Sequence, residues 1–309
     1  MHSLLTATTG FSATGLFHIY STGMTEKFNH GDCGPAKLTA TANALLFYGD
    51  QLGEARYTLY QRDRLDVADP LSMLWYNPHT RGTWFHSLPL DRDFPDPAGS
   101  WVSMRSSWTD PAGLFVAAKA GRMTGHASRM SFTPSYYSWA PSSIRRLIYS
   151  IDGNLDAGTF VLDALGERWA GELCQDDYLA PGYFSNEDQE SPRWEYYRCG
   201  TAGQNTLLLA GRNQVADAEP RTRYQSTRQH ERAPSREDSS FWIANLTMAY
   251  NGTRVSRGIR LLDGRRRVLV QDEIESQEWA QWRMHTSATI TYDDEQRMSC
   301  RFLSRYRLT

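Results

Sequence analysis

The densest group of side chains that could transfer protons lies near the N-terminus, in Phe28-Asn29-His30-Gly31-Asp32. A histidine beside an amide and a carboxylate can exchange protons near neutral pH. The alternative is structural, because the same residues suit a helix-entry turn in which Asp32 caps the following helix. The residues alone leave both interpretations open.

Two further polar clusters follow. One runs from Asn154 to Phe160 and continues to Glu172, and the other runs over residues 193–198 and continues to Gln204 and Asn205. A strand–turn–strand and an aromatic sandwich strand are the structural alternatives for them. The eight histidines form no HExxH or HxH pair, and the four cysteines form no CxxC pair, so the sequence contains no recognisable zinc-binding motif. P-loop, GxGxxG and GxSxG motifs are likewise missing from the sequence.

The spacing of apolar residues predicts helices in the first quarter and strands afterwards. Helices are expected over 37–49 and 54–67, and a short one starts at Asp69-Pro70 and ends before Asn77-Pro78. Aromatic and β-branched runs between Pro and Gly residues predict strands over 82–88, 100–108, 113–121, 158–173, 205–211 and 241–250. Strands without intervening helices favour an antiparallel sandwich.

The clearest hairpin is expected over residues 259–274, where Asp263-Gly264 is a strong turn pair between two apolar strands. The run Arg265-Arg266-Arg267 is interpreted as the solvated start of the second strand. The functional alternative is that these arginines form a patch that binds an anionic ligand. Residues 225–240 are polar and are expected to form a loop.

Composition excludes several classes of protein. The chain has 309 residues, 40% hydrophobic and 22% charged residues, and a net charge of −2, which argues against a strongly basic nucleic-acid binder. No run of 18 apolar residues occurs, so no membrane-spanning helix is expected. Residues 1–15 lack the features of a signal peptide, and we interpret the chain as lacking its true N-terminus. Aromatic residues make up 12% of the chain and suit either a sandwich core or a sugar cleft.

Four motifs, taken together, resemble the heparinase II/III-like polysaccharide lyases. They are FNHGDCGP (28–35), GHAS (125–128), NLDAGTFVLDALGERWAGEL (154–173) and RWEYYRCGTAGQNTLLLAGRNQ (193–214), and they occur in the family's order. The resemblance covers most of residues 10–290. It implies an α+β chain in which residues 1–80 are the tail of an (α/α) toroid and residues 81–309 form an antiparallel β-sandwich. A secreted or periplasmic location is expected from the family.

The resemblance also implies a reaction and a partner. The family splits acidic polysaccharides that contain uronic acid, such as heparin, heparan sulfate and alginate, by β-elimination. The uronate carboxylate is neutralised, a base removes the C5 proton, and an acid protonates the leaving oxygen. This chemistry needs no redox cofactor. Neither nucleic acid nor membrane is expected as a partner, and the sequence does not give the oligomeric state.

Carried over by position, the family's catalytic residues match only in part. His30 stands where the family usually has a catalytic Tyr, and Asn29 is the candidate that holds the carboxylate. The family's catalytic His falls on Asp152, which would repel a uronate. His126, beside the interrupted motif, is a candidate replacement for that His. Substrate-binding or scaffold roles are predicted for Arg193, Tyr197 and Asn205, whereas Trp169 and Trp194 are predicted to be core residues and His285 a structural residue on a strand.

Family members that hold a structural zinc use positions occupied here by Asn154, Glu172 and Gln204. One carboxylate and two amides make a poor zinc site, so no zinc is predicted. The sequence does not choose between disulfides and thiols for Cys33, Cys174, Cys199 and Cys300.

Residues 128–151 interrupt the family pattern. Without them GHAS would stand almost directly before Asn154, which is the family's spacing, and we therefore predict that this segment is an insertion. The functional alternatives are a lyase, a catalytically inactive carbohydrate-binding relative, and a mis-predicted fragment without stable activity. The Asp152 position favours the last two.

Overall fold

The computed structural model describes residues 9–31, 44–62, 70–96, 99–122, 153–186, 188–227, 239–292 and 298–301. The predicted insertion, His126, Asp152, Asp32 and Cys33 lie outside these residues. Among these residues, four short helices come first: α2 (Thr9–Tyr20), α3 (Ala44–Gln51), α4 (Ala55–Arg62) and α5 (Pro70–Trp75). Among the described residues, no helix is both long enough and apolar enough to cross a bilayer.

The strands form antiparallel sheets, as the sequence predicts. A five-stranded sheet runs in chain order through β1 (Arg92–Asp96), β2 (Gly99–Arg105), β3 (Phe115–Gly121), β4 (Phe160–Ala164) and β5 (Glu167–Ala170). A four-stranded sheet has the order β10 (Arg267–Glu275), β9 (Arg254–Leu262), β8 (Ser240–Asn245) and β7 (Arg221–Ser226). Two small pairs complete the described strands: β6 (Leu207–Leu209) with β11 (Ala280–Trp282), and β12 (Thr289–Tyr292) with β13 (Met298–Arg301).

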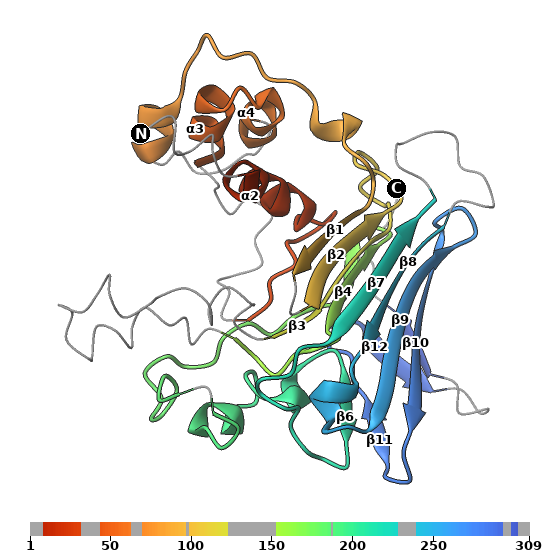
Figure 1. Ribbon diagram of the computed structural model, residues 1–309. Helices are drawn as coiled ribbons and strands as arrows, with labels where there is room; N and C mark the ends of the chain where they lie inside the picture. Colours follow the sequence, from red (N-terminus) through yellow and green to blue (C-terminus); the bar gives the residue numbers. More distant parts are fainter. Residues whose placement is uncertain are drawn as a thin grey trace, which may run out of the picture.

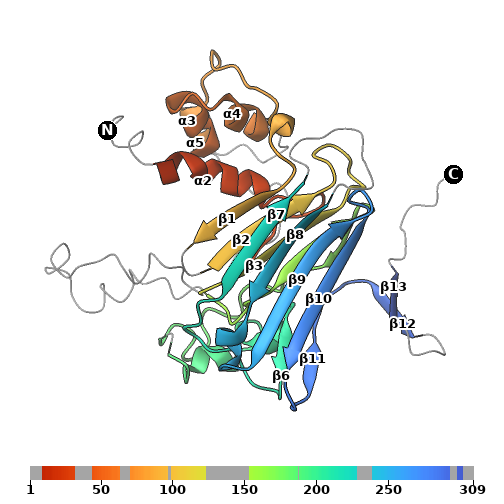
Figure 2. The same ribbon diagram turned by 45° about the vertical axis from the view of Figure 1, so that its right-hand side comes forward.

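The elements stack in three layers, with the helices on one face of the five-stranded sheet and the four-stranded sheet on the other (Figure 1). Alternation along the strands produces this arrangement, because successive side chains of a strand point to opposite faces. On β3, Val116 and Ala118 join the core between the two sheets, whereas Phe115 and Ala117 join the core beneath the helices. Figure 2 shows the β12–β13 pair standing to the side of the sandwich.

Most of the predicted elements are confirmed, and one strand is wrong. A helix begins at Pro70, and β9 and β10 form the predicted hairpin with Leu262 opposite Arg267. Residues 82–88 contain a 3₁₀ turn, Phe85–Ser87, instead of a strand. Phe85 is buried there between the rings of Tyr60 and Trp108, at centroid distances of 5.2 and 5.6 Å. Tertiary packing of one ring thus overrides the local preference for a strand.

The described helices gather on one face of the five-stranded sheet and do not close into a ring, so the structure shows the sandwich without showing a toroid. The apolar side of this layer includes Ile19, Leu45, Tyr57 and Tyr60, all at least 98% buried. The toroid therefore remains an expectation from the family.

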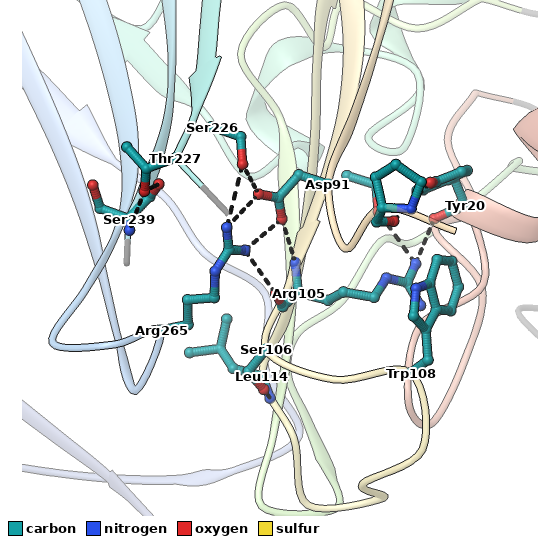
Figure 3. A network of polar contacts seen from close by, with 12 residues as sticks. Tyr20, Asp91, Arg105, Ser106, Trp108, Leu114, Ser226, Thr227, Ser239 and Arg265 are labelled. Atoms are coloured by element: carbon teal, nitrogen blue, oxygen red, sulfur yellow. Dashed lines mark hydrogen bonds and ion pairs between the residues drawn. The ribbon is translucent and has the colours of Figure 1, made fainter. Parts of the chain in front are cut away.

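A buried ion pair joins the two sheets at one end of the sandwich (Figure 3). Arg265, in the β9–β10 turn, donates from both terminal nitrogens to the two carboxylate oxygens of Asp91 at 2.7 Å each. Ser226 at the end of β7 donates to the same carboxylate, and Arg265 also donates to the backbone oxygen of Arg105 at 2.9 Å. Arg265 is fully buried, so its interpretation as a solvated strand start, or as part of an anionic-ligand patch, is wrong.

Helices α3 and α4 approach each other closely at Gly49. A Cβ placed there would lie 2.0 Å from Thr58 Oγ1, a buried hydroxyl without a hydrogen-bond partner among the described residues. In a helix interior, alanine is more favourable than glycine by about 1 kcal/mol, but overpacking typically costs about 1–3 kcal/mol. We expect Gly49→Ala to lower the free energy of unfolding, measured in urea. The double variant Gly49→Ala/Thr58→Ala should recover most of the loss, and an equally unstable double variant would contradict this account.

Candidate functional site

The candidate site lies where the segment that follows α2 crosses the end of the five-stranded sheet. Asp163 of β4 holds this segment by accepting hydrogen bonds from the backbone N–H groups of Met24 and Thr25 at 2.9 and 3.1 Å. Arg168 of β5 pairs with Asp163 and donates to the backbone oxygens of Glu26 and Lys27. Residues 24–27 are thereby fixed to the sheet, and Asn29 and His30 follow directly.

His30 is a neutral base in its surroundings. Its ring makes edge contacts with Phe17 and Phe28, at centroid distances of 6.5 and 5.2 Å. Burial, and then the positive charge of Lys119, lowers the pKa of His30 from its ordinary 6.5 to about 3. The imidazole therefore carries a free lone pair throughout the neutral range.

The lowered pKa of His30 predicts a pH-dependent stability. Between about pH 3 and pH 6.5 the unfolded chain binds a proton at this histidine and the folded chain does not. The contribution of His30 is therefore fully present above the unfolded pKa, and it is lost as the pH falls towards about 3. We expect His30→Gln to flatten the decline in unfolding free energy on acidification, measured by urea unfolding at a series of pH values. His79→Gln, at an exposed histidine, should keep the parent's slope, and a parallel slope for His30→Gln would contradict the assignment.

Asn29 is buried beside His30, with its side-chain nitrogen donating to the sulfur of Cys174. Its Oδ1 atom is also buried and has no hydrogen-bond partner among the described residues. A half-turn of the amide would exchange the two ends and present the NH2 group on that side. Asn29 can therefore offer either an acceptor or two donors to a ligand group.

Lys119, whose charge acts on His30, forms an ion pair with Asp156. The Lys119 Nζ atom lies 2.8 Å from Asp156 Oδ1, and the two residues are 8% and 1% exposed. Sequence reasoning missed Lys119, which stands in a strand of otherwise small and apolar residues and carries no local signal. The only signal that could have found it is Asp156, a carboxylate that needs a partner when buried.

The three family zinc positions do not fit a zinc ion here. The Asn154 Oδ1 atom faces the guanidinium of Arg193 at 3.5 Å, and the Gln204 side-chain nitrogen donates to a backbone oxygen at 2.6 Å. Burial raises the pKa of Glu172 well above its ordinary value, and this carboxyl accepts a hydrogen bond from Thr159. Zinc needs deprotonated oxygen, nitrogen or sulfur ligands, and a neighbouring guanidinium opposes a cation. Among the described residues, no group of three His, Cys, Asp or Glu side chains could hold a metal.

A second polar group surrounds Asn205, which is fully buried. Its Nδ2 atom donates to the backbone oxygens of Phe160 and Gly171 at 2.8 Å each, and its Oδ1 accepts from the backbone N–H of His285 at 2.7 Å. His285 Nδ1 lies 3.0 Å from the same oxygen, and His285 Nε2 lies 3.2 Å from the Tyr197 hydroxyl. Asn205 thus positions His285, and His285 meets an exposed tyrosine.

The remaining predicted residues take different places. Arg193 is fully buried and donates to the backbone oxygens of Gly153 and Tyr183, so it supports the site from within. Trp194 is buried, which confirms its prediction as a core residue, and Trp169 is half-buried. His285 follows β11 and lies outside any strand, contrary to prediction, because its backbone N–H bonds the Asn205 side chain. Cys199 is buried, and Cys174 is half-buried.

Comparison with known proteins agrees with this architecture. The family model for the heparinase II/III-like C-terminal domain matches residues 148–307, which is just over half of the chain. The chain belongs to the heparinase II/III-like family. This confirms the family resemblance. Two of the four motifs, residues 154–173 and 193–214, lie inside the matched region, and the second contains the candidate residues Arg193, Tyr197 and Asn205. No curated protein matches the chain.

Solved heparinase structures share the fold at low sequence identity. A mutant of the heparan sulfate lyase HepC from Pedobacter heparinus superposes with a TM-score of 0.57 at 12% identity, covering 90% of this chain and 35% of that one. A heparinase III with methylated lysines gives 0.57 at 12% identity, covering 91% and 34%. Another heparinase III gives 0.51 at 14% identity, covering 85% and 34%. The chain thus spans about a third of the length of these structures.

Proposed function

We propose that the chain forms the sandwich side of a polysaccharide lyase active site and takes part in β-elimination on uronic-acid-containing glycans. One observation carries the proposal: His30, a neutral imidazole, stands next to the buried amide of Asn29, whose oxygen has no partner among the described residues. A neutral imidazole can remove a proton, and an amide can hold a carboxylate. These two groups meet two of the three demands of the reaction.

The environment of His30 suits a change of charge during the reaction. Burial and the charge of Lys119 hold its pKa at about 3. A uronate carboxylate bound beside it would add a negative charge and raise that pKa, because an opposite charge favours the protonated imidazole. The imidazole would thus become a stronger base when substrate is present, and the protonated ring could return its proton to the leaving oxygen.

Family membership and the likeness to heparan sulfate lyases support the choice of substrate class. We propose an acidic polysaccharide of the heparin, heparan sulfate or alginate kind. The other side of the active site would come from helices of an (α/α) toroid, of which residues 1–80 would be the last part. His126 remains the candidate replacement for the family's catalytic His, whose own position is occupied by Asp152; both residues lie outside the described part of the chain.

The proposal is tested with the 309-residue chain and a panel of heparin, heparan sulfate and alginate. β-Elimination leaves a double bond conjugated to the uronate carboxylate, so the ultraviolet absorbance of the mixture rises as bonds are cleaved. A rise with any of the glycans supports a lyase. No rise from a sample that unfolds in one cooperative transition would contradict the proposal.

The second candidate is an inactive relative that binds acidic glycans without cleaving them. Asp152, at the family's catalytic His position, favours it, because a carboxylate there would repel a uronate. Binding of heparan sulfate by calorimetry without any rise in absorbance would support this candidate over the lyase.

A further inference from the structure

A chain of hydrogen bonds runs from the buried Asn205 to the surface. The Asn205 amide has a defined orientation, because its nitrogen faces two backbone oxygens and its oxygen faces a backbone N–H group. Since Asn205 Oδ1 can only accept, His285 Nδ1 must carry the proton that lies between them. His285 Nε2 is therefore the unprotonated nitrogen in the neutral ring, and it accepts from the Tyr197 hydroxyl.

The chain of hydrogen bonds ends at a cation. A terminal nitrogen of Arg283 donates to the Tyr197 oxygen at 3.0 Å, and the other terminal nitrogen donates to Gln281 Oε1 at 2.9 Å. Each of these nitrogens carries two N–H groups, so each keeps one for another acceptor. Among the described residues, no carboxylate lies within ion-pair distance of Arg283.

The surroundings of Arg283 form a surface pocket of about 290 Å³, lined by Tyr197, Gln281, Trp282, Arg283, Met284 and His285. Tyr197 is 48% exposed and Trp282 is 42% exposed. Exposed aromatic rings beside a positive charge without a carboxylate partner offer an apolar face to a sugar ring and a fork of donors to its anionic substituent. The hydrogen bonds to Tyr197 and Gln281 hold the guanidinium in one orientation.

The pocket and the His30 site flank one segment of chain. The Gly171 N–H donates to the His285 backbone oxygen at 3.0 Å on one side, and Cys174 accepts from Asn29 on the other. Gly171 and Cys174 are separated by at most about 10 Å of extended chain, so we expect a polymer that reaches His30 to pass close to this pocket.

We propose that Arg283 and Tyr197 form a subsite for an acidic sugar, in which Arg283 contacts the anionic group while His285 and Asn205 act as positioning residues. Arg283 is the contact residue because the Tyr197 proton is already committed to His285. The inference rests on the proposed function for the kind of ligand, and its anionic group is a uronate carboxylate or a sulfate.

Calorimetric binding tests the subsite apart from catalysis. The probes are a heparan sulfate tetrasaccharide, its desulfated form, and the desulfated form with its carboxyl groups reduced to alcohols. Arg283→Gln should weaken binding of the sulfated tetrasaccharide by roughly 10- to 100-fold, as expected for loss of a charge-assisted hydrogen bond, and should leave binding of the reduced probe unchanged. Arg221→Gln removes an exposed arginine of β7 and should bind all three probes like the parent.

Two further variants separate contact from positioning. Tyr197→Phe keeps the ring and removes the hydroxyl that anchors Arg283, so it should weaken binding of the charged probes less than Arg283→Gln does. Arg283→Lys keeps the charge without the planar fork and should restore part of the affinity. Comparison of the two charged probes identifies the anion: an Arg283→Gln effect that persists without sulfate assigns a carboxylate, and one that disappears assigns a sulfate.

The outcomes for the subsite and for the lyase are distinguishable. Weaker binding by Arg283→Gln in a chain that releases no unsaturated product would support the subsite and overturn the lyase. Unchanged binding by Arg283→Gln, or a parent chain that binds none of the probes, would overturn the subsite whether or not product forms.

Discussion

Asp91→Asn should lower the free energy of unfolding by about 3–5 kcal/mol, because it leaves the fully buried Arg265 guanidinium without its counter-charge. The same carboxylate accepts from the backbone N–H of Arg105 at 3.1 Å and from the Ser226 hydroxyl at 2.5 Å. Its loss would therefore affect both sheets at once. The midpoint of urea unfolding, with the slope monitored for two-state behaviour, measures the change.

A double variant separates the unpaired charge from other effects. Asp91→Asn/Arg265→Met removes both charges, so no unpaired charge stays buried and much of the stability should return. The matched control is Glu275→Gln in the exposed Arg254–Glu275 pair, which should change the free energy of unfolding by less than about 1 kcal/mol. Equal losses at the buried and exposed pairs would contradict this account.

His30→Gln should reduce the rate of unsaturated-product formation by about 10²–10⁴-fold, the usual contribution of a general acid or base. Glutamine retains hydrogen-bonding groups but cannot take up a proton in the working pH range. Since His30 is uncharged above about pH 3, its replacement by a neutral residue should leave glycan binding nearly unchanged at neutral pH. The loss is therefore expected in kcat rather than in KM.

His79→Gln, at an exposed histidine, controls for the removal of an imidazole and should keep the parent's rate. Asn29→Ala should raise KM as well as lower kcat if its amide holds the carboxylate. An active His30→Gln variant would remove His30 from the reaction, even if the chain proved to be a lyase.

The sequence predicts local elements better than it predicts what becomes buried. The hairpin at Asp263-Gly264 is a local feature and is confirmed. The burial of Arg265 depends on Asp91, which lies 174 residues earlier in the chain. Because the sequence gives no sign of this distant partner, the three consecutive arginines suggest a solvated strand start. The 3₁₀ turn at Phe85 is likewise decided by rings that only the fold brings together.

The same limit applies to the candidate site. The cluster at His30 is visible because its residues are consecutive, and the family motifs point to Tyr197 and Asn205. The partners that give these residues their chemistry come from distant positions. Lys119 pairs with Asp156 across 37 residues, and Tyr197 meets His285 across 88. A contact of this kind leaves no periodicity or spacing that a single sequence could reveal.

The fastening of residues 21–31 has a consequence for dissection of the protein. Asp163 and Arg168 form hydrogen bonds with the backbone of residues 24–27, and Arg105 donates to the backbone oxygens of Tyr20 and Thr22 at 3.0 and 3.1 Å. This stretch therefore belongs mechanically to the sandwich, although it lies far before the first strand in the chain. A fragment that begins after residue 80 would keep the sheets but lose residues 21–31, which pack against them, and with these residues His30. If a protease cleaves the chain near residue 80, the N-terminal piece and the sandwich should stay associated as a nicked complex.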